Sequence, residues 1–224
     1  MKTFLPAVSV VAVALLMPIA AFAQADIEPA RFIDGSIPQM PPLAASGGDV
    51  MLSVAVSASG TVGAVDVLRS TPPFTEAVVA AVKTWRFSPA LDGKRVPMDA
   101  RVLVDVVVGA PSLNVPTAGT PPKDVSSSDT RVPFPAQVSA PSYPVNARSE
   151  GTALVETRVD PTGHVVGVTS LRSSPPFDVA AMDAARAWTF RPAQGAAAPP
   201  STYAYLLFVF RQPVMGAAPP MRKP

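Results

Sequence analysis

Hydrophobic and polar side chains alternate along residues 50–56, and they do so again along residues 155–160. A period of two residues is typical of a strand that buries one face. Both stretches lead through a glycine-containing turn into a second apolar stretch, at residues 61–69 and 164–172. Because glycine accepts the positive φ of such turns, the pattern predicts a β-hairpin in each half of the chain.

A helical period follows each hairpin. Apolar residues recur every three or four positions along residues 74–85 and 177–188, which predicts two helices, each with one buried face. Thr75 and Asp178 stand at equivalent positions near the start of these segments. Both residue types accept hydrogen bonds from the first helical N–H groups, so we expect them to be the N-caps.

The two halves are copies of one unit. A shift of 103 residues aligns residues 48–108 with residues 151–211 without a gap and with 20 identical residues. A third apolar stretch, at residues 100–108 and 203–210, gives each copy the order β-β-α-β. We therefore expect an α+β protein of two small domains, each a three-stranded antiparallel sheet with a helix packed across one face.

Proline marks the boundaries of the copies. The chain has 28 prolines among 224 residues, and residues 109–141 combine prolines with a run of serines and no regular period. We expect this segment to be a Pro-rich linker between copy one, residues 40–108, and copy two, residues 142–211. Residues 24–39 and 212–224 are predicted to be an N-terminal arm and a tail.

Residues 1–23 have the three parts of a secretory signal peptide. Lys2 precedes a short apolar stretch, and the segment ends in Ala-Phe-Ala. This predicts an exported, periplasmic protein. The alternative is an uncleaved inner-membrane anchor with the rest of the chain in the periplasm, because the 19 residues from Leu5 to Ala23 carry no charge.

Few residues are candidates for chemistry. The chain has no cysteine and one histidine, His164, which excludes thiolate catalysis, Cys-ligated metals and paired-histidine sites. His164 and Asp160 lie in the predicted hairpin turn, and a formal charge of +2 is too small to favour nucleic acid. We expect no catalytic residue, no metal, no cofactor and no nucleic-acid partner, and so a protein that is not an enzyme.

Three motifs of copy two follow one another at a specific spacing. They are Y-P-x-x-A-R at residues 143–148, D-x-x-G at 160–163 and W-x-F-x-P at 188–192. Together they resemble the C-terminal domain of TonB proteins, over about 70 residues in each copy. Copy one departs from the family pattern: it has Met-Pro-Pro-Leu-Ala-Ala in place of the first motif, and neither copy has the glycine that follows Arg-Ser-Ser in the family.

The resemblance implies a TonB-like protein of TonB-dependent transport. Its partner would be the N-terminal peptide of an outer-membrane transporter or another envelope protein, and possible further partners are an inner-membrane motor complex and a second copy of the chain. The runner-up with the same fold is a membrane-anchored energy transducer. From another class, the alternative is a non-catalytic structural module of the envelope whose two domains pair only with each other or with peptidoglycan.

The third strand of copy two is the candidate partner-binding element. Residues 203–210 are apolar on both faces and contain no Lys, Pro or Asp, whereas the same strand of copy one contains Arg101 and Asp105. An unguarded edge favours the addition of a partner strand. The alternative is that this strand is central in a sheet or is buried against the other copy. The candidate partner-binding residues are Tyr203, Ala204, Tyr205, Leu206, Leu207, Phe208 and Val209, with Tyr143 and Arg148 of the family motif.

Overall fold

The computed structural model describes residues 27–41, 47–110, 118–119, 131–194 and 202–212. The predicted export segment and most of the predicted tail lie outside the described residues. Within them, no helix is long and apolar enough to cross a membrane.

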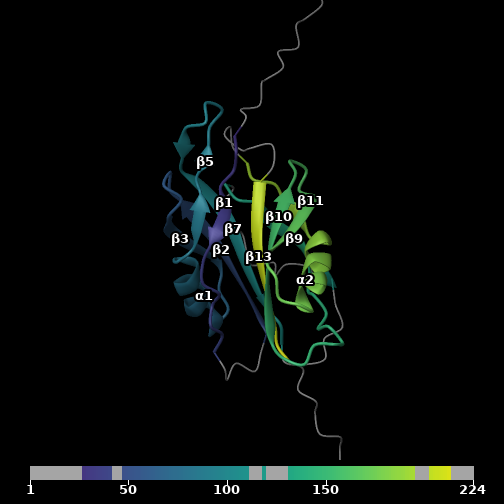
Figure 1. Ribbon diagram of the computed structural model, residues 1–224. Helices are drawn as coiled ribbons and strands as arrows, with labels where there is room; N and C mark the ends of the chain where they lie inside the picture. Colours follow the sequence, from purple (N-terminus) through teal and green to yellow (C-terminus); the bar gives the residue numbers. More distant parts are fainter. Residues whose placement is uncertain (1–26, 42–46, 111–117, 120–130, 195–201, 213–224) are drawn as a thin grey trace, which may run out of the picture.

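One six-stranded sheet runs through both copies (Figure 1). Each copy supplies three antiparallel strands, as the sequence predicts, and the third strands of the two copies lie side by side in parallel at the centre. The fold class is confirmed as α+β, with the two small units merged edge to edge. The strand order is β11 (Val165–Arg172), β10 (Gly151–Val159), β13 (Thr202–Phe210), β7 (Ala100–Val108), β2 (Gly48–Val56) and β3 (Val62–Arg69).

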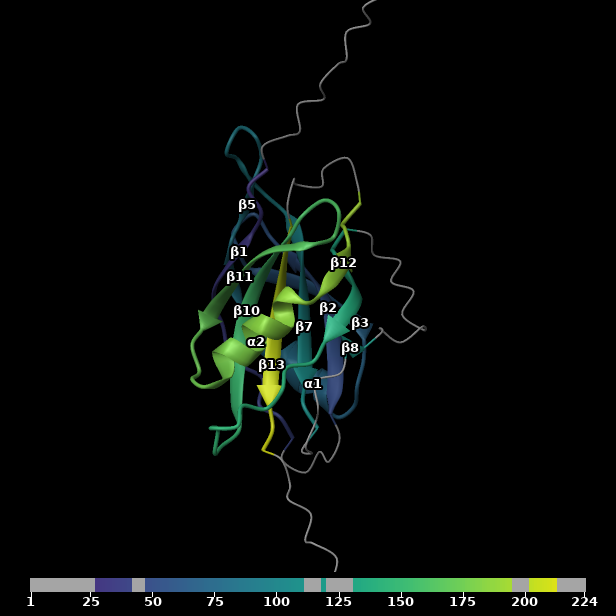
Figure 2. The same cartoon turned by 90° about the vertical axis from the view of Figure 1, so that its right-hand side faces the viewer.

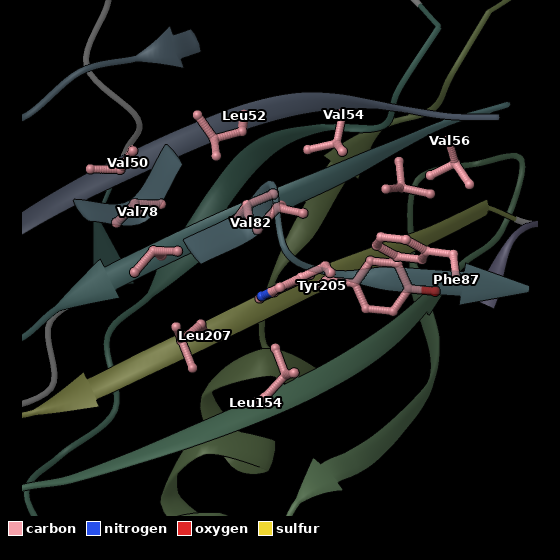
Figure 3. Close-up of a cluster of buried hydrophobic side chains, with 14 of the residues drawn as sticks. Val50, Leu52, Val54, Val56, Val78, Val82, Phe87, Leu154, Tyr205 and Leu207 are labelled. Atoms are coloured by element: carbon pink, nitrogen blue, oxygen red, sulfur yellow. The ribbon is translucent and has the colours of Figure 1, made fainter. Parts of the chain in front are cut away.

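The two helices cover opposite faces of this sheet (Figures 1 and 2). Helix α1 (Phe74–Val82) belongs to copy one, and α2 (Phe177–Arg186) belongs to copy two. Because strand side chains alternate between faces, every central strand contributes to both cores. The core under α1 contains Leu154, Tyr205 and Leu207 of copy two, which lie among the valines of copy one (Figure 3). The core under α2 contains Met51 and Leu103 of copy one.

A further strand begins each copy. Strand β1 (Arg31–Asp34) pairs with β4 (Arg86–Ser88), and β9 (Phe134–Ser139) pairs with β12 (Thr189–Arg191) at positions 103 residues later. In the sequence, β1 lies in the predicted arm and β9 in the predicted linker. Three two-residue strands complete the fold: β5 (Ala90–Leu91) pairs with β6 (Pro97–Met98), and β8 (Ala118–Gly119) pairs with β9.

The tryptophan after each helix holds the added strand in place. The indole Nε1 of Trp85 donates a hydrogen bond of 2.9 Å to the carbonyl of Ser36, and the indole of Trp188 donates one of 2.9 Å to the carbonyl of Ser139. Both rings are buried. The equivalence of the two contacts shows that the duplicated unit includes the segment before the predicted domain boundary.

The prediction of Thr75 and Asp178 as N-caps is wrong. Both lie inside the first helical turn, and prolines occupy the cap positions. The Asp178 carboxylate instead accepts the backbone N–H of Ser174 at 2.9 Å, and the Thr75 hydroxyl accepts that of Thr71 at 3.0 Å. These side chains therefore fasten the loop between hairpin and helix.

Candidate partner-binding site

Strand β13 is paired on both sides. It is antiparallel to β10 along its whole length, and residues 204–209 are parallel to residues 103–108 of β7. The expectation of an open edge at this strand is therefore wrong, and the alternative of a central strand is confirmed. The absence of Lys, Pro and Asp has a simpler cause here, since a strand that is covered on both edges and both faces needs no guarding charge.

The side chains of β13 form parts of the two cores. Tyr205, Leu207 and Val209 pack on the α1 side, and Ala204, Leu206, Phe208 and Phe210 pack on the α2 side. Of the predicted site residues on this strand, Tyr203 is the one that is half-exposed. With the two copies in contact, the others meet only the protein interior. Their contact with a partner stays a prediction that needs β7 to leave.

Tyr143 and Arg148 belong to the loop before β10 and not to β13. The Tyr143 hydroxyl donates a hydrogen bond of 2.9 Å to the carbonyl of Ser149, and its ring packs edge-on against Phe177, with centroids 5.9 Å apart. These contacts fix the loop that precedes β10. Arg148 is exposed in the same loop.

A polar cluster joins the first strand of copy one to copy two. The Arg31 guanidinium donates two hydrogen bonds to the Glu156 carboxylate, at 2.6 and 2.8 Å, and lies over the Tyr203 ring, 4.5 Å from its centroid. The Tyr205 hydroxyl accepts the Phe32 N–H at 3.0 Å and donates to the Ala30 carbonyl at 3.1 Å.

Burial governs the charges of this cluster. The Glu156 side chain is 3% exposed, so it depends on the cation that copy one supplies. The hydrogen bond to Glu156 raises the pKa of Arg31, and burial raises the pKa of the Tyr205 hydroxyl. Tyr205 is therefore neutral and Arg31 charged at physiological pH. No local sequence pattern indicates this ion pair, because 125 residues separate its two partners.

A second polar group lies inside the sheet of copy one. Asp105 on β7 is fully buried, and neither of its carboxylate oxygens has a hydrogen-bond partner. Arg69 on β3 faces it across Met51 of β2, and the Arg69 guanidinium bonds instead to Asp49. Burial raises the pKa of Asp105 to about 7, and burial also lowers the pKa of Arg69. An acid within the apolar run of residues 102–108 is the one sequence signal that this group offers.

The two outer edges of the sheet are irregular. The pairing of β10 with β11 shifts register twice, and that of β2 with β3 shifts twice at equivalent places. Such bulges twist an edge and interrupt its row of backbone groups. The parallel pairing of β13 with β7, by contrast, runs over six consecutive positions without a shift of register.

The polar side chains of the hairpin turn in copy two bond to one another and to the turn backbone. The Asp160 carboxylate accepts the backbone N–H of His164 at 2.9 Å, and the hydroxyl of Thr162 lies 2.8 Å from Nδ1 of the His164 ring. The hydrogen bond from Thr162 lowers the pKa of Asp160. Among the described residues, no three acidic, histidine or cysteine side chains gather where they could hold a metal ion.

Comparison with protein families decides the relationship of this chain to known proteins. The model of the Gram-negative bacterial TonB protein C-terminal family matches twice, at residues 38–106 and 139–211. The chain belongs to the TonB C-terminal family. It carries two tandem domains of this family, which is an envelope family of non-catalytic, transport-associated domains that interact with outer-membrane transporters. No curated protein matches the chain.

Proposed function

We propose that this chain is an exported binding protein of TonB-dependent transport that recognises an extended segment of an outer-membrane transporter or another envelope protein. Its membership of the TonB C-terminal family supports the transport role, and residues 1–23 support export. Binding is by strand addition and involves no catalytic step.

The observation that carries this proposal is the parallel pair at the centre of the sheet. Residues 204–209 of β13 already accept one extended strand, β7, along six consecutive positions. Main-chain hydrogen bonds of this kind supply much of the affinity when a peptide joins a sheet. A partner segment would take the place of β7 and meet the backbone of the predicted site residues.

The same observation favours a second candidate. If β7 never leaves β13, the two domains pair only with each other, and the chain is a structural module of the envelope. The bidentate contact of Arg31 on β1 with Glu156 on β10 is a second attachment between the two copies. The two candidates differ in one measurable property, which is whether the central strand pair opens.

A cross-link between the central strands separates the two candidates. Val108 and Val209 are directly opposite in the parallel pair, and the chain has no other cysteine to interfere with a V108C/V209C disulfide. Neighbouring strands lie about 4.8 Å apart, within the span of a disulfide. The probe is a set of fluorescent peptides from the N-terminal segments of outer-membrane transporters, with scrambled peptides and V209C alone as controls.

For the binding protein we expect saturable fluorescence anisotropy with the native chain and with the reduced double variant, and loss of binding on oxidation. Absence of binding in every form contradicts the proposal and supports the structural module. Equal binding by the oxidised and reduced forms places the peptide site elsewhere on the molecule.

The N-terminus of the purified envelope protein decides between export and anchoring. A mass that begins after residue 23 fits the exported form. A mass that includes residues 1–23 fits the alternative, an anchored transducer in contact with an inner-membrane motor complex.

A further inference from the structure

Asp105 makes β7 an imperfect partner of β13. Its side chain is 0% exposed, and it lies on the α2 side between Met51 of β2 and Leu206 of β13. No hydrogen bond compensates the carboxyl group, and two nitrogens of the facing Arg69 also lack partners. A buried polar group without a hydrogen bond keeps its full desolvation cost.

The equivalent position of copy two shows what the sheet accepts there. Leu207 pairs with Leu154 of β10 as Asp105 pairs with Met51 of β2, so Leu207 is the structural equivalent of Asp105, and it is fully buried in the core under α1. The duplicated strand therefore carries an apolar side chain in one copy and an uncompensated acid in the other. The acid is not needed to pair the strands, since their contact is made by backbone groups.

We propose that β7 is a displaceable occupant of β13 and that Asp105 is the residue that makes it displaceable. This inference rests on the proposed peptide-binding function and adds its regulation. The partner it fits is an extended segment that runs parallel to β13 and places an apolar residue opposite Leu206. Such a segment makes the same backbone bonds as β7 without burying a carboxyl group.

The closed pairing also depends on pH. The charged groups of the described elements that face Asp105 are Arg69 of β3 and, beyond it, Asp49 of β2, whereas β13 presents Leu206. In the closed form the pKa of Asp105 is about 7, against an ordinary value of 3.8. The stability of the closed pair is therefore full below the ordinary value and falls as pH rises to about 7. Peptide affinity should rise over this interval by up to about tenfold per pH unit and then level off.

The test replaces the acid in the full-length exported chain. D105V removes the desolvation cost, D105N keeps the shape but cannot ionise, and D183N removes an exposed acid of α2 as the matched control. Hydrogen exchange at residues 103–108 and 204–209 measures opening without any ligand, and anisotropy with the transporter peptides measures binding.

We expect D105V to slow this exchange and to weaken peptide binding by about 10- to 100-fold, the range that corresponds to one unsatisfied buried group. D105N should lose the rise of affinity between pH 5 and 7, and D183N should behave as the native chain does.

Peptide binding that is as tight in D105V as in the native chain, with unchanged exchange, overturns the inference while the proposed function stands. Slower exchange in D105V together with no peptide binding by any form supports a displaceable β7 and contradicts the proposed function.

Discussion

The tryptophan that follows each helix, Trp85 or Trp188, contacts several elements of its copy. Trp188 is 2% exposed, packs against Phe190 and Phe208, and donates its indole N–H to Ser139 of β9. Trp188→Ala should lower the free energy of unfolding by about 3–5 kcal/mol, because it leaves a large cavity and an unpaired carbonyl. Urea denaturation measures this, and Trp188→Phe, which retains most of the ring, should lose less. A Trp188→Ala chain of native stability that no longer binds peptide would instead place the indole in the binding site.

The sequence predicts the role of a residue when that role depends only on its neighbours along the chain. Gly60 and Gly163 have φ of 79° and 90°, and a Cβ at either would lie within 2 Å of a backbone carbonyl oxygen, so the glycine turns were recognisable from local pattern alone. Asp105 was recognisable as a charge in an apolar strand, but from the sequence it is interpreted as a charge that protects an open sheet edge from pairing. Its true surroundings depend on which strand lies beside it, and no local pattern carries that information.

At the scale of elements, β1 fastens copy one to copy two through Arg31. Arg31→Ala leaves the buried Glu156 carboxylate without its cation and should lower the free energy of unfolding by roughly 2–4 kcal/mol, less than for a wholly buried pair because Arg31 is 46% exposed. Thermal or urea unfolding measures the loss. The matched control is Arg95→Ala, which breaks the exposed pair with Glu28 and should change stability by less than about 1 kcal/mol. Equal effects of the two substitutions would show that the contact of β1 with copy two is not held by the ion pair.

The elements themselves follow from periodicity, and the short strands do not. Helices α1 and α2 have a period of 3.6 residues, the first long strand of each copy alternates, and the other long strands are apolar stretches, and the structure has all of them where the sequence predicts them. Strand β9 contains Pro135 and has no alternation, so its composition is that of a linker. It is a strand because Thr189–Arg191 of β12 offers backbone groups to it, a contact between segments more than 50 residues apart.

At the scale of the whole molecule, the two copies form one six-stranded sheet and share their cores. The sequence predicts two domains on a linker, and two such domains would unfold independently. In the structure the cores are shared, because Leu154, Tyr205 and Leu207 of copy two complete the core under α1. We therefore expect one unfolding transition, monitored together by circular dichroism and by tryptophan fluorescence. Two separated transitions would mean that the copies are independent.

Cleavage between the copies tests the same coupling without a substitution. Residues 134–139 of the predicted linker are a strand of copy two and Val132 is buried, so we expect limited proteolysis to cut first before residue 131. The two fragments should still elute together from a sizing column, because the parallel pair of β7 and β13 and the contact of Arg31 with Glu156 do not need the covalent connection. The fragments should separate in urea. If β7 is displaceable, a peptide that pairs with β13 should also separate the two fragments of the nicked chain, and it should open the strand pair of the intact chain less. This follows because the linker keeps β7 at a high local concentration near its edge, and the cut removes that advantage. Fragments that separate in buffer without peptide would show that the central strand pair is too weak to hold the copies, which would contradict the single unit described here.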